Sequence, residues 1–261
     1  MIQISRATLT AIYRYPVKGL TGERLSDVTL EAGATLPFDR AYAIENGPSP
    51  FDATAPRYLP KTHFLMLMRN EALARLTARF DDATHVLTLS EHGRETAAGD
   101  LRTPEGRRVI EDLLAAFMSA NTSPGALRGP PRVLSSAGHS FSDVSAKCLH
   151  IVNMESVRAL ATLIGVPIDP LRFRPNIIID GLPAWGELDW NDKTLSAAGG
   201  VRLKVFKRTE RCAATNVDPA TGARDLNIPT LLSRTLGHTD FGIYARCETA
   251  GLLRQGDVFD T

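Results

Sequence analysis

Cysteine is scarce in this sequence. Only Cys148, Cys212 and Cys247 occur among the 261 residues, no two of them form a Cys-x-x-Cys pair, and their number is odd. A disulfide framework needs an even number of cysteines and an oxidising compartment. We therefore expect no disulfide framework in this protein. The cysteines therefore indicate a reducing compartment, which we take to be the cytoplasm.

Long apolar runs and excess charge are also missing. No stretch approaches the ~20 apolar residues of a membrane helix, and residues 1–10 hold only short apolar patches, without the apolar core of a signal peptide. The formal net charge is +1, which argues against binding to nucleic acid or to a membrane surface through bulk electrostatics. We expect a protein without a targeting segment or a membrane anchor.

What remains is an ordinary globular composition with many short strand patterns. Hydrophobic residues make up 43% and charged residues 23%, so the chain can bury a core and stay soluble. Alternating or β-branched apolar runs, interrupted by glycine and proline, predict a β-dominated fold. The predicted strands are residues 9–15, 28–30, 41–44, 64–69, 85–90, 132–135, 148–152, 177–179, 201–206 and 244–248.

Three helices interrupt these strands. Thr103 is an N-cap residue before Pro104, and the apolar residues up to residue 121 recur at helical spacing. Asn153 begins a second helix that ends at Gly165, and residues 227–236 predict a third that Gly237 ends. Residues 122–131 are rich in proline and glycine and form the best candidate linker. We therefore divide the chain into residues 1–121 and residues 122–261.

Cys212 has the most reactive surroundings of the three cysteines. It follows the strand pattern of residues 201–206 and the cations Lys207, Arg208 and Arg211, and it precedes a turn-forming segment. A thiolate beside cations at a strand end is stabilised and accessible, so it can bind a metal or attack a substrate. A small buried core cysteine is the alternative, and local chemistry alone leaves both interpretations open.

Several motifs resemble those of the MOSC-domain proteins, a molybdenum-cofactor family that includes the mitochondrial amidoxime-reducing component and its bacterial relatives. The motifs occur in the family's order along nearly the whole chain. They are Tyr15-Pro16-Val17-Lys18, Asp39-Arg40, Arg174-Pro175-Asn176, Arg211-Cys212, Asp218-Pro219-Ala220-Thr221-Gly222, Phe241-Gly242 and Gly256-Asp257. The resemblance implies a smaller N-terminal β domain packed on a C-terminal MOSC β-barrel.

The resemblance also implies a cofactor site. Lys18, Arg40 and Arg174 would converge on the cofactor's phosphate, to which lysine offers a point charge and arginine a planar fork. Cys212 would be the metal ligand, because a thiolate matches molybdenum held by a pterin dithiolene. The remaining implied cofactor-binding residues are Asp143, Ser145, Asn176 and Arg211.

The activity implied by the resemblance is the reduction of N-hydroxylated compounds or N-oxides by a molybdenum-cofactor (molybdopterin) enzyme. With no cysteine cluster in the sequence, electrons are expected from a separate ferredoxin-type or cytochrome-type protein and its reductase. Two alternatives stay open: a sulfur carrier that uses a Cys212 persulfide, and a non-catalytic cofactor-binding protein. A cysteine hydrolase is disfavoured, because His238 is the only histidine near Cys212 in sequence.

Overall fold

The largest sheet of the protein closes into a barrel. The computed structural model describes residues 6–261, and within them seven strands form a ring whose neighbours are all antiparallel except β9 and β10. Strand β1 closes the ring by pairing with both β10 and β15. Around the barrel the order is β10 (Ile177–Asp180), β9 (Leu149–Asn153), β13 (Asp240–Thr249), β12 (Arg202–Glu210), β11 (Thr194–Ala197), β15 (Val258–Asp260) and β1 (Arg6–Arg14).

Alternate side chains of the barrel strands point inward and fill the barrel interior. In β12, for example, Leu203 and Val205 are fully buried, whereas Arg202 on the same strand is exposed. Successive side chains point to opposite faces of a strand, so Leu203 and Val205 both face the barrel interior. Trp190 and Phe259 are buried in the same apolar cluster and complete the barrel core.

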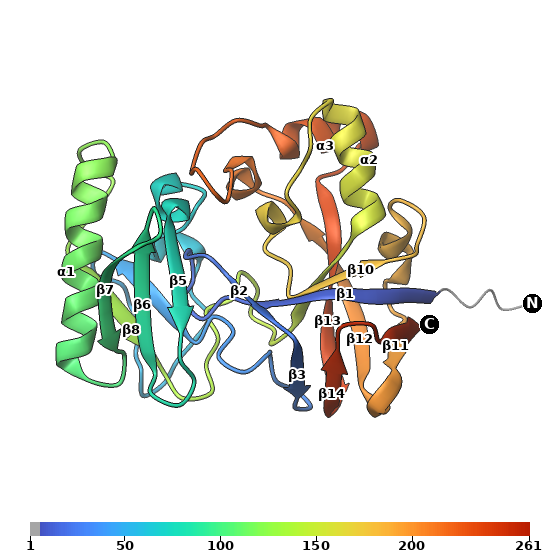
Figure 1. Cartoon of the computed structure of the whole chain (residues 1–261), viewed down its shortest axis with the longest axis horizontal. Helices are drawn as coiled ribbons and strands as arrows, with labels where there is room; N and C mark the ends of the chain where they lie inside the picture. Colours follow the sequence, from blue (N-terminus) through green and yellow to red (C-terminus); the bar gives the residue numbers. More distant parts are fainter. Residues whose placement is uncertain (1–5) are drawn as a thin grey trace, which may run out of the picture.

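A second, smaller β unit lies beside the barrel, on the left in Figure 1. One strand pair joins β4 (Tyr42–Asn46) to β8 (Pro131–Ser135). A three-stranded antiparallel sheet contains β5 (Leu76–Phe80), β6 (Val86–Glu91) and β7 (Arg94–Asp100), and α1 (Pro104–Asn121) covers it. The helix backbone touches β7 directly, because a Cβ on Gly99 would lie 2.2 Å from the carbonyl oxygen of Gly106.

The three predicted helices are present. Thr103 caps α1 by accepting a hydrogen bond from the Gly106 amide. Helix α2 (Met154–Ile164) begins after Asn153 and ends at the left-handed Gly165, and α3 (Ile228–Leu236) ends at Gly237. Both α2 and α3 lie at one end of the barrel (Figure 1). Short strands β2 (Glu23–Leu25), β3 (Asp27–Leu30) and β14 (Gly251–Arg254) complete the fold.

One predicted strand is wrong. Of residues 64–69 only Phe64 makes a β-bridge, to Glu45, and a turn follows. The reason is Asn70, whose side chain accepts from the Met66 amide while its own amide donates to the Met66 carbonyl, so the segment curls instead of extending. Strands β5 and β7 were not predicted. Strand β5 does alternate, with Leu76, Ala78 and Phe80 buried, and this signal was missed, whereas β7 lacks an apolar alternation.

The β-dominated fold with a smaller N-terminal β part on a barrel is confirmed. The chain crosses between the two parts: β1 belongs to the barrel, while β8 pairs with β4 in the smaller part. The division at residue 121 stays a prediction. Across residues 6–261 no helix combines the length and the apolar character needed to cross a bilayer.

Candidate functional site

A cleft of about 250 Å³ opens where the barrel meets the smaller part. Residues that are far apart in the sequence line it together. Seven of the eight predicted site residues do so: Lys18, Arg40, Asp143, Arg174, Asn176, Arg211 and Cys212. The eighth, Ser145, is exposed and does not line the cleft. The structure therefore brings the predicted cations and the cysteine to one place, while their roles stay predictions.

Tyr15 holds two of the guanidinium groups against its ring. Arg40 Cζ lies 4.4 Å and Arg174 Cζ 4.2 Å from the ring centroid, and Arg40 Nη2 donates to the Arg174 carbonyl at 3.1 Å. Both arginines have left-handed backbone, with φ of 51° and 52°. This conformation is uncommon for residues other than glycine and is tolerated where the surroundings enforce it. The two positive charges are thus fixed side by side.

Arg174 lacks a compensating anion. Its Nη1 donates to the carbonyl of Leu20 at 2.7 Å, and it forms no ion pair within residues 6–261. Burial lowers the pKa of Arg174 to about 10; Tyr15 opposes this shift and the positive charge of Arg40 adds to it. A bound anion would relieve this cost.

Lys18 is buried at the base of the cleft. Its Nζ donates to the Phe141 carbonyl at 2.8 Å and forms an ion pair with Asp143. Burial lowers the pKa of Lys18 although Asp143 opposes the shift. For Asp143, desolvation favours the neutral acid, but Lys18 and then Lys61 outweigh it and hold the carboxyl pKa below its ordinary value. Asp143 is therefore an ionised carboxylate that an incoming anion would have to compete with.

Cys212 is half-buried at the cleft wall, where it precedes the short helix η6 (Ala213–Asn216). Lys61, at the start of η1 (Lys61–His63), donates from Nζ to Cys212 Sγ at 3.1 Å. Burial disfavours the charged form of Lys61, but Asp143 and Cys212 together raise its pKa above the ordinary value. The cysteine thus faces a cleft and a cation and is not enclosed in apolar core.

Lys61 was not among the predicted site residues. The cations expected to act on Cys212 were its sequence neighbours, but Arg208 turns away and donates to the Leu188 carbonyl, and Lys207 pairs with Glu210 at 3.6 Å. The only sequence signal for Lys61 is that it follows the proline-rich residues 46–60, a segment typical of a loop over a site.

Arg211 and His150 form a second polar pair, which sequence patterns also missed. Arg211 Nη2 donates to the Phe173 carbonyl at 2.8 Å, and Nη1 lies 3.3 Å from His150 Nε2. Burial and the charge of Arg211 hold the pKa of His150 well below its ordinary value, so the imidazole is neutral and accepts at Nε2. Gly242 makes room for it, because a Cβ there would lie 2.7 Å from His150 Nε2.

Asn176 uses its side chain within the fold. The Oδ1 atom accepts from the His150 amide at 3.0 Å, and Nδ2 donates to the Tyr13 carbonyl at 3.2 Å. In this arrangement Asn176 joins β9 to β1 at the edge of the cleft. Its predicted contact with a cofactor would use the remaining hydrogen-bonding capacity of the amide.

The donor set of the cleft fits an anionic organic cofactor. Seven cationic side chains line it against the three carboxylates of Asp39, Asp143 and Glu210, and the buried Nε of Arg211 has no hydrogen-bond partner within residues 6–261. The described part of the chain contains no cluster of three or more histidine, cysteine or acidic side chains that could hold a metal. A metal at Cys212 would therefore need most of its ligands from a cofactor.

The fold and the cleft together define the class of protein. Residues 137–260 match the family model of the MOSC domain, and residues 6–123 match that of the MOSC N-terminal beta barrel domain. The chain therefore belongs to the MOSC-domain proteins.

Its relatives include mitochondrial amidoxime-reducing components and a molybdenum cofactor sulfurase. Mitochondrial amidoxime-reducing component 1 of Xenopus laevis is 31% identical over 124 residues, which are 43% of this chain and 35% of that protein. The component 2 protein of Homo sapiens is 37% identical over 97 residues, or 33% of this chain and 28% of that protein. Molybdenum cofactor sulfurase of Drosophila willistoni is 34% identical over 158 residues, which are 57% of this chain and 19% of that protein.

These alignments span about a third or less of the relatives' own lengths. Among solved structures, the YuaD protein from Bacillus subtilis aligns with 100% of this chain and 97% of its own, at 13% identity and a TM-score of 0.46.

Proposed function

We propose that this protein binds a molybdenum cofactor in the cleft and reduces N-hydroxylated compounds or N-oxides, with Cys212 as the metal ligand. The observation that carries the proposal is the position of Cys212, half-buried in a cation-rich cleft with Lys61 at 3.1 Å from its sulfur. Thiolates are the protein ligands that suit a soft metal centre. The amidoxime-reducing relatives supply the substrate class.

Each part of the cleft has a task in this proposal. Lys18, Arg40 and Arg174 would hold the cofactor's phosphate, because the two arginines are half-buried cations fixed at Tyr15 and Lys18 is a buried cation in the same cleft. Arg211, Asn176 and Asp143 line the space where the pterin would lie. Ser145 does not line the cleft, so only the family resemblance supports it as a cofactor contact.

The chemistry divides between cofactor and protein. A bound molybdenum cofactor supplies two-electron oxygen-atom transfer from the substrate nitrogen. Lys61 donates a hydrogen bond to Cys212 Sγ and would hold the sulfur in place at the cleft, and the surrounding cations would offset the negative charge of the cofactor. Electrons would come from a separate ferredoxin-type or cytochrome-type protein.

A sulfur-carrier function is the second candidate, and the match to molybdenum cofactor sulfurase over 57% of the chain favours it. In that function Cys212 would carry a persulfide, and the protein would act without bound metal. A non-catalytic cofactor-binding protein would hold molybdenum and show no turnover.

Purification from a host that makes the molybdenum cofactor separates the three. We expect about one molybdenum and one pterin per chain, and turnover of benzamidoxime with a reduced viologen dye as electron donor. Metal without turnover would favour a binding protein, and cyanide-labile sulfur on Cys212 without metal would favour the carrier. Cys247→Ala is the matched control, because Cys247 is buried away from the cleft.

A further inference from the structure

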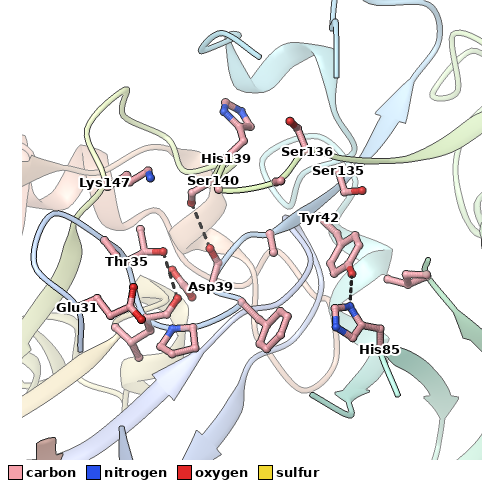
Figure 2. A pocket seen from close by; sticks show the side chains of 18 of the residues that line it. Glu31, Thr35, Asp39, Tyr42, His85, Ser135, Ser136, His139, Ser140 and Lys147 are labelled. Atoms are coloured by element: carbon pink, nitrogen blue, oxygen red, sulfur yellow. Dashed lines mark hydrogen bonds between the residues drawn. The ribbon is translucent and has the colours of Figure 1, made fainter. Parts of the chain in front are cut away.

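A second and larger cavity, of about 440 Å³, lies beyond the wall formed by residues 36–42. Figure 2 shows its side chains: Glu31 and Thr35 on one side of the hollow, and Tyr42 and His85 on the other. The α1 side chain Arg107 also lines it. Its volume is in the range of small-molecule pockets, roughly 300–1,000 Å³, and the proposed molybdenum chemistry does not use it.

Arg107 carries a positive charge without a carboxylate partner. Its guanidinium donates to the Leu101 carbonyl at 2.6 Å, to Ser135 Oγ at 2.7 Å and to the Val133 carbonyl at 3.4 Å. All three acceptors are neutral, and Arg107 forms no ion pair with any residue between 6 and 261. It also lies near the N-terminus of α1, where the helix dipole disfavours a positive charge.

The other charged groups of the cavity do not offset this charge, and Lys147 adds a further cation to the wall. Arg102 is already paired with Asp100 at 2.8 Å. Asp39 is engaged through its two oxygens by the Tyr15 amide and by Arg40. Glu31 is exposed and lies across the hollow from Tyr42 (Figure 2). The inner end of the cavity is therefore electropositive.

Hydroxyl groups and apolar side chains complete the wall. The Tyr42 hydroxyl lies 3.0 Å from His85 Nδ1. Burial raises the pKa of Tyr42, although Arg107 opposes this shift, so the phenol stays protonated. The remainder of the wall is largely apolar and includes Leu36, Pro37, Phe38, Ala41 and Leu101.

We propose that this cavity binds a small organic acid, with its carboxylate at Arg107 and Ser135 and its apolar body against the Leu36–Phe38 segment. A guanidinium that gives two parallel hydrogen bonds to a carboxylate is the strongest such contact that proteins make. The apolar part of the wall favours a ligand with an apolar body over a bare inorganic anion. This inference does not depend on the proposed function.

The test compares 3-phenylpropionate with 3-phenylpropanamide, which has the same shape without the charge, by titration calorimetry and ligand-detected NMR on the full chain. We expect the acid to bind at least about tenfold more tightly than the amide, the fold-change of a lost charged hydrogen bond. Arg107→Gln should remove this preference, whereas Arg108→Gln, an exposed neighbour on the same helix that does not line the cavity, should keep it.

A blocking variant guards against misfolding and against binding elsewhere. Ala137 is exposed at the rim, so Ala137→Trp should fill the cavity without unfolding the protein and should abolish binding of the acid. Equal binding of acid and amide, no saturable binding up to about 10 mM, or undiminished binding to Ala137→Trp, which would place the acid in the cation-rich cleft, would each overturn the proposal.

Discussion

The cleft at Cys212 and the second cavity share Asp39 in their walls and differ in chemistry. The cleft is the smaller, at about 250 Å³ against about 440 Å³, but it gathers seven cations and the only half-buried cysteine of the described chain. The cavity is larger, has a largely apolar wall and contains one unpaired guanidinium. Of the two, only the cleft has a side chain suited to a soft metal.

The smaller of the two sites contains the greater number of cationic side chains. Arg174 and Arg211 are held in the cleft by carbonyl and ring contacts without a carboxylate. Such charges cost stability in the free protein. An anionic ligand bound in the cleft would offset that loss of stability.

The largest effect should come from Cys212→Ala. Even the hydrogen-bond partners of metal ligands change activity by about 10–100-fold, so loss of the ligand itself should reduce N-oxide or amidoxime reduction by at least about a hundredfold. The fold should persist, because the residue is small and at a loop edge. Steady-state rates and a thermal melt check this, with Cys247→Ala as control. Full activity of Cys212→Ala would end the molybdenum assignment of the cleft.

Arg174→Gln sharpens the comparison through cofactor retention. Removing one phosphate contact should lower the molybdenum content at limiting cofactor by about tenfold, measured by elemental analysis after dialysis. The melting temperature of the cofactor-free protein should not fall, because an uncompensated charge is lost. Arg208→Gln, whose side chain points away from the cleft, should change neither quantity. A large loss of stability with normal cofactor content would reverse the interpretation of Arg174.

Lys61→Met should have a smaller effect. Without its ammonium group the anionic form of Cys212 loses a charged hydrogen bond, so alkylation of Cys212 by iodoacetamide in the cofactor-free protein should slow by about threefold to tenfold. Mass spectrometry of the labelled peptide follows the reaction. The matched variant is Lys207→Met, since Lys207 pairs with Glu210; equal slowing by both variants would mean that only the general field of the cleft acts on the thiol.

The smallest effect concerns pH. His150 is neutral when folded, with its pKa well below 6.5, so the unfolded chain binds a proton that the folded chain does not. Stability should therefore fall as the pH drops below about 6.5, by about 1.4 kcal/mol per pH unit at most, and should be level above it for this group. Urea unfolding at pH 7.5 and 5.5 gives the decrease in the free energy of unfolding on acidification. This decrease should be about 1 kcal/mol smaller in His150→Gln than in the wild type.

The sequence was informative where signals are local. Caps at Thr103 and Asn153 locate two helices, and the arginine–cysteine and arginine–proline–asparagine motifs point to the cleft. Sequence patterns did not predict the contacts that tertiary packing makes. Lys61 reaches Cys212 across 151 positions, Asn70 turns an apolar run away from strand geometry, and the second cavity forms from segments that share no motif. Periodicity describes one segment at a time and contains no distances between segments.

The position of β1 has a consequence for how the chain folds during synthesis. This strand is synthesised well before its barrel partners β10 and β15, which begin at Ile177 and Val258. Until those residues are made, only Ile12–Arg14 of β1 have a strand partner, in β2. The rest of β1 is an unpaired edge of the kind that is prone to aggregation. Contacts of such long sequence separation close slowly. The smaller part, contiguous from β4 to β8, is able to fold first, so the barrel should be the late step and the one most in need of a chaperone.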